Sequence, residues 1–310
     1  MKVTALAGGV GGAKLVKGLA QILPGTDLSV IVNTGDDFEH YGLNISPDID
    51  SVVYSLADLA EPKLGYGREN DSYICFDTLI DFNENPWFRL GDKDLALQLL
   101  RTSLLRSGKS LTETTRKICK ALGITVKIIP MADDRVFTTI ETKDFGELSF
   151  QEYFVKHRFE PEIRRINYSD SQFASVTKKV RTAITTADLV VICPSNPWLS
   201  IFPILSIGNV ETMLMQKKVI AVSPIIKSKA VKGPAAKIFS ELGQRPSATA
   251  VAELYKKWLN GIVIDNSDVD ECILIESLGI KATVTDIIMK DDIDKRRVAE
   301  KVLEFAELVI

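Results

Sequence analysis

The N-terminus constrains this chain most, because a short apolar segment runs into a glycine-rich turn and then into a helical pattern. The apolar segment covers residues 2–7, the helical periodicity runs from about 13 to 22, and between them lie Gly8, Gly9, Gly11 and Gly12. Glycines allow close backbone approach, and the first N–H groups of a helix attract anions. The sequence predicts a phosphate at this turn, with Lys14 offsetting its charge.

The glycine pattern matches neither of the two common phosphate loops. It lacks the G-K-[ST] ending of a P-loop, and its glycines do not follow the G-x-G-x-x-G register. The glycines could instead serve only a tight turn and close strand–helix packing. Both interpretations stay open at this point.

Alternating strand and helix patterns predict the fold. Residues 2–7, the following helix and residues 28–33 form a β-α-β unit, which implies parallel strands and a right-handed crossover. Further buried strands are expected at 125–129, 189–193, 219–222 and 261–264. The prediction is an α/β protein with a Rossmann-like, doubly wound, mostly parallel sheet.

Two stretches interrupt this alternation. Residues 55–123 are helix-rich, with apolar periodicity at 94–106 and 111–122, and we expect them to form a helical insertion. The Rossmann-like core would then comprise residues 1–54 and 124–310. A second excursion, at 135–175, mixes a β-prone segment at 136–141 with a basic one at 156–165 before a helix at 176–187.

Composition excludes several classes of protein. The 310 residues are 45% hydrophobic and carry a formal charge of −3, which argues against a nucleic-acid partner. The four cysteines form no C-x-x-C pair, so a zinc site or disulfide framework is not expected. No segment approaches the ~20 apolar residues of a membrane span, and no signal peptide is recognisable. We expect a cytoplasmic protein with no membrane partner.

The densest group of polar residues follows the second strand. Asn33, Asp36 and Asp37 come first, and Asp48 and Asp50 follow shortly after. Ligands of open α/β sheets lie beyond the carboxyl ends of strands, so this loop and the glycine turn should share a crevice. Four aspartates would repel a phosphate unless a divalent cation intervened. Asp48 and Asp50 are the predicted Mg²⁺ ligands, since Mg²⁺ prefers one or two carboxylates plus phosphate oxygens and waters.

The aspartates also have a purely structural interpretation. Asp48 could cap a helix at residues 49–57, while Asp36 and Asp37 could be turn residues. A capping Asp48 is compatible with a metal-binding Asp50. We therefore expect at least one of this pair to contact metal or substrate.

Two further strand ends carry polar groups. Ser195 and Asn196 lie between two prolines after residues 189–193, where they could donate to a phosphate or a base edge or simply form a turn. A lysine group that includes Lys232 follows residues 219–222. These lysines could counter a diphosphate or only solvate a loop, and a short charge run does not decide between the two.

Taken together, these motifs resemble the 2-phospho-L-lactate transferase (CofD) family. The resemblance spans nearly the whole chain and rests on six segments, at residues 8–14, 33–37, 46–50, 87–92, 194–197 and 232–234. Each segment alone is unspecific, whereas their combination is specific.

The resemblance implies a magnesium-dependent transferase of deazaflavin coenzyme biosynthesis. Such an LPPG:Fo 2-phospho-L-lactate transferase passes the 2-phospholactyl group of lactyl-2-diphospho-5'-guanosine to a ribityl hydroxyl of Fo, 7,8-didemethyl-8-hydroxy-5-deazariboflavin. GMP leaves, and coenzyme F(420)-0 is formed. The resemblance also implies a homodimer, and it leaves open whether the donor acid is lactate or derives from phosphoenolpyruvate.

The resemblance further assigns roles to residues. Asp50 and Arg89 are expected to contact Fo, with Trp87 in the same aromatic stretch, although Arg89 could also be a surface arginine packed on a tryptophan. The acidic group is expected to hold Mg²⁺, chiefly through Asp48 and Asp50 with help from Asp36 or Asp37, and one carboxylate could take the proton of the attacking hydroxyl. The residues expected to seat the donor are Gly8, Gly9, Gly11, Gly12, Lys14, Asn33, Ser195, Asn196 and Lys232.

Two rival functions remain in view. A dinucleotide-dependent oxidoreductase would place an acidic residue at the end of the second strand, where this chain has Asn33. A YvcK-like regulator, which binds a nucleotide sugar without transferase activity, would share the glycine turn and the aspartates. Such a regulator is expected to lack the segment at residues 87–92.

Overall fold

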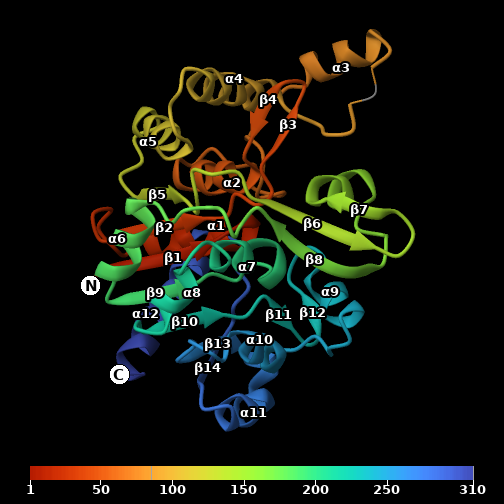
Figure 1. Ribbon diagram of the computed structural model, residues 1–310. Coiled ribbons are helices and arrows are strands. Elements are labelled where there is room, and N and C mark those ends of the chain that lie inside the picture. The colour runs from red at the N-terminus through yellow and green to blue at the C-terminus, as the bar shows by residue number, and fades with distance from the viewer. Residues whose placement is uncertain (85, 310) are drawn as a thin grey trace.

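Seven parallel strands form the central sheet of the computed structural model, which describes residues 1–84 and 86–309 (Figure 1). The order across the sheet is β14–β13–β10–β9–β1–β2–β5, and each neighbouring pair runs parallel. The strands are β1 Val3–Ala7, β2 Leu28–Val32, β5 Lys127–Pro130, β9 Leu189–Ile192, β10 Val219–Val222, β13 Gly261–Asp265 and β14 Lys281–Thr285. The predicted doubly wound sheet is confirmed, and β14 is a strand that the sequence analysis did not predict.

Helices cover both faces of this sheet (Figure 1). One apolar cluster contains residues of α1 Gly9–Ala20, α2 Pro47–Leu56, α5 Leu111–Ala121 and α12 Asp292–Leu308. The opposite cluster contains residues of α6 Lys178–Thr186, α8 Val210–Leu214, α9 Ala235–Glu241 and α10 Ala248–Tyr255. Strand β1 contributes Ala5 to the first cluster and Leu6 to the second. Burial on both faces explains why the strands read as apolar runs without alternation.

Helix α1 begins earlier than predicted. It starts at Gly9 and ends at Ala20, so the glycines form its first turn and Gly8 is its extended N-cap residue. A Cβ at Gly11 would lie under 3.0 Å from the Pro194 carbonyl oxygen, and one at Gly12 would lie 2.7 Å from Ser195 Oγ. Only glycine allows the helix to begin this close to the segment after β9, so close packing is one of the functions of this turn.

The order of the strands places the glycine turn at the topological switch point. From β1 the chain proceeds through β2 to β5 at one edge, whereas β9, β10, β13 and β14 extend to the other edge. The carboxyl ends of β1 and β9 are therefore adjacent, and ligands of doubly wound folds bind at such a point. The segment after β9 continues into the one-turn helix η2 Pro197–Ile201 and α7 Phe202–Leu205.

The connection from β2 to β5 rises above the sheet and carries the helix-rich segment (Figure 1). It contains the hairpin of β3 Phe38–His40 and β4 Leu43–Ile45, then α2, α3 Ile74–Asp81, α4 Asp92–Arg106 and α5. Helices α4 and α5 match the predicted periodic stretches. The proposed boundaries of the insertion, at 54/55 and 123/124, stay a prediction; they lie close to the end of α2 and before β5.

Helix α4 buries polar residues beside Leu104, while two of its leucines stay exposed. Gln98, Arg101 and Thr102 are each at most 3% exposed, whereas Leu99 is 53% exposed and Leu100 40% exposed. Apolar periodicity alone would have placed the leucines inside. The hydroxyl of Thr102 accepts the backbone N–H of Asn44 at 2.8 Å, which fixes this polar side against the β3–β4 hairpin.

The second excursion forms a small antiparallel sheet, in the order β7–β6–β8. Its strands are β6 Phe137–Thr142, β7 Gly146–Ser149 and β8 Ile163–Ser169, with the short turn η1 Glu152–Lys156 between β7 and β8. The remaining short elements are β11 Ile225–Ile226, β12 Lys229–Ala230, η3 Asn266–Glu271 and α11 Cys272–Ser277. Within the described part of the chain, no helix has the length and apolar character needed to cross a bilayer.

Candidate active site

The glycine turn and the aspartate-rich segment meet at the switch point. The backbone N–H of Gly9 donates to Asp48 Oδ1 at 2.7 Å. Asp48 lies in the first turn of α2, one residue after Pro47, and is buried. The positive end of α1 therefore stabilises an acidic side chain directly. The contact brings the two segments together as the sequence predicted.

Asp48 does not cap α2. Helix α2 begins at Pro47, so the N-cap position belongs to Ser46, and the Asp48 carboxylate reaches Gly9 and Asn33 instead. The capping alternative considered for Asp48 is thus wrong. Pro47 at the first helical position fixes the backbone dihedral, and the helix starts two residues earlier than a capping Asp48 would require.

Asn33 links the end of β2 to this acid. Its Nδ2 donates to Asp48 Oδ2 at 2.9 Å and to the Leu199 carbonyl at 3.1 Å, while its Oδ1 accepts the N–H of Gly35 at 2.9 Å. Asn33 is fully buried. With every group of its amide engaged by the protein, Asn33 orients the carboxylate of Asp48.

Asp36 and Asp37 each carry a buried oxygen without a partner. Oδ1 of both residues lacks a hydrogen bond, whereas Asp37 Oδ2 accepts the Ser46 hydroxyl at 2.6 Å. Burial, together with neighbouring carboxylates, raises the pKa of both acids well above the usual aspartate value. Burial also raises the pKa of Asp48 to about 6. Burial therefore favours the neutral form of these acids when nothing else is bound.

Asp50 faces helix α4. The Arg101 guanidinium grips both carboxylate oxygens of Asp50, and Gln98 Nε2 donates to Asp50 Oδ2 at 2.9 Å. Asp37 lies near the same guanidinium. The positive charge of Arg101 lowers the pKa of Asp37, but burial raises that pKa by more. Asp36, Asp37, Asp48 and Asp50 are called the aspartate cluster below.

Ser195 and Asn196 differ in how free they are to bind a ligand. The Ser195 hydroxyl accepts the N–H of Gly8 at 3.1 Å and donates to the Gly8 carbonyl at 2.7 Å, so it clamps the glycine turn. Asn196 Oδ1 accepts the N–H groups of Trp198 and Leu199, whereas its buried Nδ2 has no partner. The Asn196 amide is therefore an unused donor beside the glycine turn.

The two lysines predicted to hold phosphate have protein partners. Lys14 Nζ donates to the Met289 carbonyl at 2.6 Å, and burial lowers its pKa. Lys232 Nζ donates to the Leu64 carbonyl and lies 5.1 Å from the centre of the Tyr66 ring. Lys14 is among the charges that lower the pKa of Lys232, so the two ammonium groups lie within electrostatic range of each other.

Trp87 and Arg89 occupy the insertion above the hairpin. The Trp87 ring lies 5.8 Å from the Phe38 ring and 5.5 Å from the His40 ring, in an aromatic group that joins the insertion to β3. The Arg89 guanidinium lies 3.8 Å from the centre of the Tyr73 ring rather than on Trp87. Arg89 is itself exposed, which leaves its outer edge open to a ligand.

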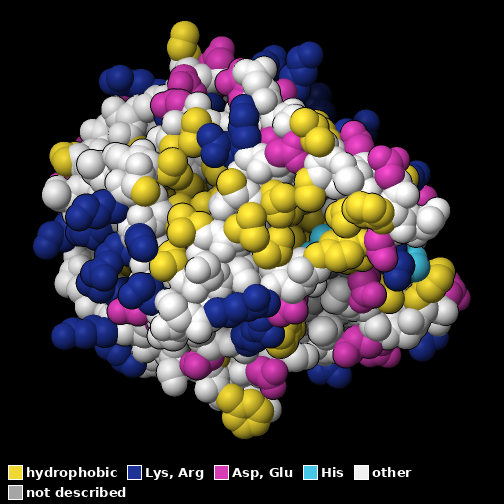
Figure 2. Space-filling view, turned by 90° about the horizontal axis from the view of Figure 1, so that it is seen from above, with side chains coloured by type: hydrophobic (Ala, Val, Ile, Leu, Met, Phe, Trp, Pro, Cys, Tyr) yellow, Lys and Arg dark blue, Asp and Glu magenta, His cyan; other side chains and the backbone are white. Residues whose placement is uncertain are grey.

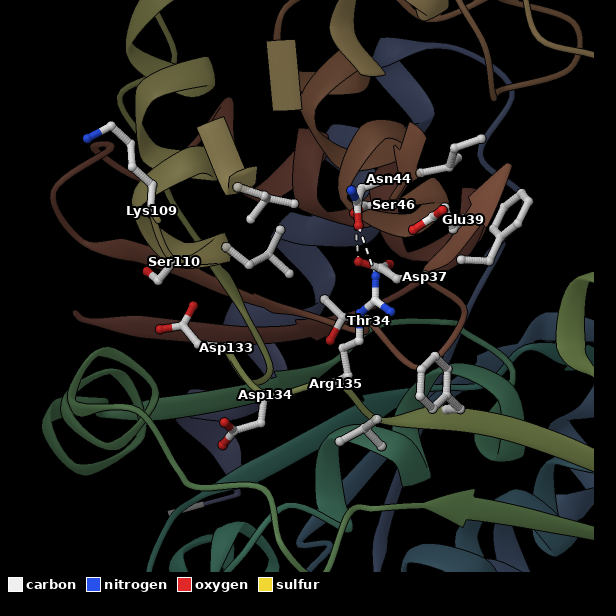
Figure 3. Close-up of a pocket in the computed structure, with 16 residues that line it drawn as sticks. Thr34, Asp37, Glu39, Asn44, Ser46, Lys109, Ser110, Asp133, Asp134 and Arg135 are labelled. Carbon is white, nitrogen blue, oxygen red and sulfur yellow. Dashed lines mark hydrogen bonds between the residues drawn. The ribbon is translucent and has the colours of Figure 1, made fainter. Parts of the chain in front are cut away.

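A pocket of about 180 Å³ opens between the hairpin, the α4–α5 junction and the β5–β6 connection (Figure 3). Figure 3 shows Asp37 beside Ser46 among the lining residues, with Arg135 directed toward Asn44. Its walls include Phe38, Leu105 and Val136. The pocket therefore combines apolar walls with an acidic residue of the aspartate cluster.

The donor set of the cluster fits Mg²⁺, which takes carboxylate, phosphate and water oxygens. Asp36 Oδ1 and Asp37 Oδ1 are buried acceptors that lack a donor, so each is available to a cation. Among residues 1–84 and 86–309, no three His, Cys, Asp or Glu side chains converge as a complete metal-ligand set. A cation here would draw its other ligands from phosphate and water.

Sequence reasoning missed two members of this site, Gln98 and Arg101. Both lie in a leucine-rich helix whose pattern gives no local sign of a polar buried side. Only the docking of α4 on the hairpin brings them to Asp50. Ser46 belonged to a quoted motif, but its hydrogen bond to Asp37 also depends on the turn before α2.

Comparison with known proteins gives a consistent picture. A family model described as "2-phospho-L-lactate transferase CofD" matches residues 3–302. The 2-phospho-L-lactate transferase of Methanocaldococcus jannaschii is 39% identical over 306 residues, covering 98% of this chain and 97% of that protein. The 2-phospho-L-lactate transferase of Methanopyrus kandleri is 38% identical over 312 residues, covering 100% of this chain and 99% of that protein.

A solved structure shares the fold. A UPF0052 family protein from Bacillus halodurans superimposes with a TM-score of 0.64, covering 97% of this chain and 99% of that one. The two sequences are 15% identical, so the likeness concerns the architecture alone.

Proposed function

The chain belongs to the 2-phospho-L-lactate transferase CofD family and is a 2-phospho-L-lactate transferase, and from this premise we propose how its switch-point site carries out the transfer. The donor is lactyl-2-diphospho-5'-guanosine, the acceptor is the deazaflavin Fo, and the products are coenzyme F(420)-0 and GMP. The observation that carries the proposal is the buried aspartate cluster joined to the glycine turn through Asp48 and Gly9.

The reaction is a phosphoryl-type displacement. A ribityl hydroxyl oxygen of Fo forms a bond to the phosphorus that bears the lactyl group, and the bond from that phosphorus to the bridging oxygen breaks. GMP leaves with the bridging oxygen, and the hydroxyl proton passes to a carboxylate. Positioning and charge stabilisation are the main requirements of such a step, so no covalent protein nucleophile is needed.

The glycine turn and the segment after β9 would bind the donor. The Cβ positions of Gly8, Gly11 and Gly12 face Asp48, Pro194 and Ser195 of the protein, whereas that of Gly9 is open and would let a phosphate approach the turn. The unpartnered Asn196 Nδ2 would donate to a phosphate or guanosine oxygen. Asn33 and Ser195 would hold the shape of this site, because their polar atoms already bond to the protein. Lys14 and Lys232 would offset the charge of the diphosphate after exchanging their carbonyl partners.

The aspartate cluster would hold Mg²⁺. Asp48 and Asp50 are the ligands expected from the family resemblance, and the unpartnered oxygens of Asp36 and Asp37 are two further candidates. When bound, the cation neutralises charge on the diphosphate and on the leaving GMP. The high pKa values of Asp36 and Asp37 support a role for one of these carboxylates as the acceptor of the hydroxyl proton.

The insertion would provide the acceptor site. Arg89 presents an exposed guanidinium beside an aromatic group that contains Trp87, which suits a planar ring with polar edges. Asp50 would contact the ribityl chain at the end nearer the donor. The pocket beside Asp37 adds apolar walls from Phe38, Leu105 and Val136.

We further propose that the protein is a homodimer. Helix α3 buries none of its residues, and its apolar side chains are therefore open to solvent: Ile74 is 72% exposed and Ile80 is 50% exposed. Figure 2 views the molecule from the side of α3 and α4 and has apolar side chains gathered across the centre of that face. A second copy would cover these side chains.

The test uses purified protein, Fo, the guanosine donor and Mg²⁺. We expect GMP and a more anionic deazaflavin to appear in equal amounts by chromatography, and EDTA to stop both. A parallel reaction with the phosphoenolpyruvate-derived donor identifies the preferred acid. Donor binding without product under every donor and metal would contradict transfer and would favour the regulator alternative.

A further inference from the structure

The buried polar side of α4 requires an explanation beyond packing. A helix docked on a core normally buries its leucines, yet α4 exposes Leu99 and Leu100 and buries Arg101, which is 1% exposed. Removing a guanidinium from water is costly unless a carboxylate and good hydrogen bonds compensate it. The compensating group here is Asp50, a residue of the proposed active site.

The contact geometry is well defined. Both terminal nitrogens of Arg101 bond to Asp50, one to each carboxylate oxygen, and one of them also donates to Gln98 Oε1. The Gln98 amide donates to Asp50 as well. Asp50 therefore accepts three hydrogen bonds from a single face of α4, which fixes its rotamer and its distance from the rest of the cluster.

Charge counting gives Arg101 a second role. The aspartate cluster contains four carboxyl groups, and Arg101 is the cationic side chain that bonds to any of them within the described part of the chain. Lys14 and Lys232 donate to backbone carbonyls instead. One fixed positive charge thus offsets part of the negative charge that a divalent cation would otherwise meet.

We infer that Arg101, supported by Gln98, is a positioning residue that orients Asp50 toward the acceptor and moderates the affinity of the aspartate cluster for a divalent cation. The part of this inference that concerns the acceptor rests on the proposed function. The part that concerns cation affinity applies to the free protein and does not depend on turnover.

The test compares Arg101→Gln, which removes the charge, with Arg101→Lys, which keeps the charge but loses the two-pronged contact. Mg²⁺ binding to the free protein is measured by calorimetry at pH 8, and KM is measured separately for Fo and for the guanosine donor. We expect Arg101→Gln to bind Mg²⁺ about tenfold more tightly, since the cluster becomes one charge more negative. The KM for Fo should rise about tenfold, while the KM for the donor stays within about twofold.

Arg101→Lys is expected to keep wild-type Mg²⁺ affinity and to raise the KM for Fo about fivefold. An ammonium group cannot bond to both carboxylate oxygens of Asp50 as the guanidinium does. Arg116→Gln on the exposed side of α5 removes the same charge away from the cluster and serves as the matched control. A purely structural role would weaken Mg²⁺ binding and raise both KM values together. Weaker or unchanged Mg²⁺ binding in Arg101→Gln therefore overturns the inference.

Two further outcomes are distinguishable. If Arg101→Gln does not fold, as judged by thermal unfolding, the Arg101→Lys result decides, and an unchanged KM for Fo in that variant overturns the positioning role. If the wild-type protein transfers nothing to Fo, the proposed function fails, while the Mg²⁺ titration still accepts or rejects the role of Arg101 in the cluster.

Discussion

The carboxylate of Asp48 accepts the backbone N–H of Gly9 at 2.7 Å, across 39 positions of sequence. The same carboxylate accepts Asn33 Nδ2 at 2.9 Å. One acid thereby joins the start of α1 to the end of β2. The first N–H of the helix is occupied, so a donor phosphate must bind the neighbouring groups of the turn while it lies close to the aspartate cluster.

Asp48→Asn should abolish most of the activity while keeping the fold. The variant amide can still accept from Gly9, but its NH₂ group would face the NH₂ group of Asn33, which costs about 1–2 kcal/mol. Loss of the charge should lower kcat/KM at least about 100-fold, as measured by GMP release. Asp144→Asn, at an exposed position, is the control, and near-normal turnover by Asp48→Asn would remove Asp48 from the site.

Gly11→Ala should destabilise the protein far more than Gly9→Ala. A Cβ at Gly11 would overlap the Pro194 carbonyl, which is backbone and cannot move cheaply, so we expect a loss of about 2–4 kcal/mol. A Cβ at Gly9 meets nothing within 4 Å, and only its φ of +61° is unfavourable, at about 1 kcal/mol. Urea unfolding of both variants measures the difference, and equal losses would show that packing against Pro194 is unimportant.

Activity and stability should respond to pH in opposite directions. Burial raises the pKa of Asp48 from 3.8 to about 6, so the folded protein holds this proton longer than the unfolded chain. The resulting stabilisation is present below pH 4 and is lost as the pH rises to about 6, a change of roughly 3 kcal/mol. Urea unfolding in EDTA should register this loss in the wild type relative to Asp48→Asn.

The same titration should set the acidic limb of the activity profile. kcat/KM should rise about tenfold per pH unit below 6, since the proposed metal site needs an ionised Asp48. Burial also raises the pKa of Asp94 to about 6, so Asp94→Asn is the matched control. If the acidic limb disappears in Asp94→Asn, the limb reports the titration of Asp94 and not that of Asp48.

Arg89→Ala should act on the acceptor alone. The guanidinium lies on the Tyr73 ring, outside the glycine turn, and its removal should raise the KM for Fo about tenfold with little change in the KM for the donor. Steady-state kinetics with each substrate varied in turn provides the measurement. Arg116→Ala is the control, and an unchanged KM for Fo would defeat the assignment.

Charged substitutions on α3 should dissociate the proposed dimer. Ile74→Glu places a carboxylate on a side chain that is 72% exposed, so the folded monomer should tolerate it while a closed interface should not. Light scattering during gel filtration should change from a dimer to a monomer mass. Ile293→Glu, at a residue that is 79% exposed on α12, is the control; a wild-type monomer would refute the dimer directly.

The sequence by itself determined the class of fold and predicted where the site would lie. Apolar runs of strand length, separated by helical periods, specify a parallel sheet, because only strands buried on both faces lack polar alternation. Glycines after residue 7 and aspartates after residue 33 mark the carboxyl ends of adjacent strands. These signals are local in the chain, and for that reason they could be read before any contact was known.

Tertiary structure alone decided which groups of the site are free and which are held. Ser195 was expected to offer its hydroxyl to a ligand, yet that hydroxyl clamps Gly8, while the Asn196 amide stays unused. Arg101 reaches Asp50 across 51 positions of sequence, from a helix that exposes Leu99 and Leu100 while it buries Arg101. Such pairings depend on how helices dock on the sheet, and no periodicity encodes them, because the compensating charge lies on a different element of the fold.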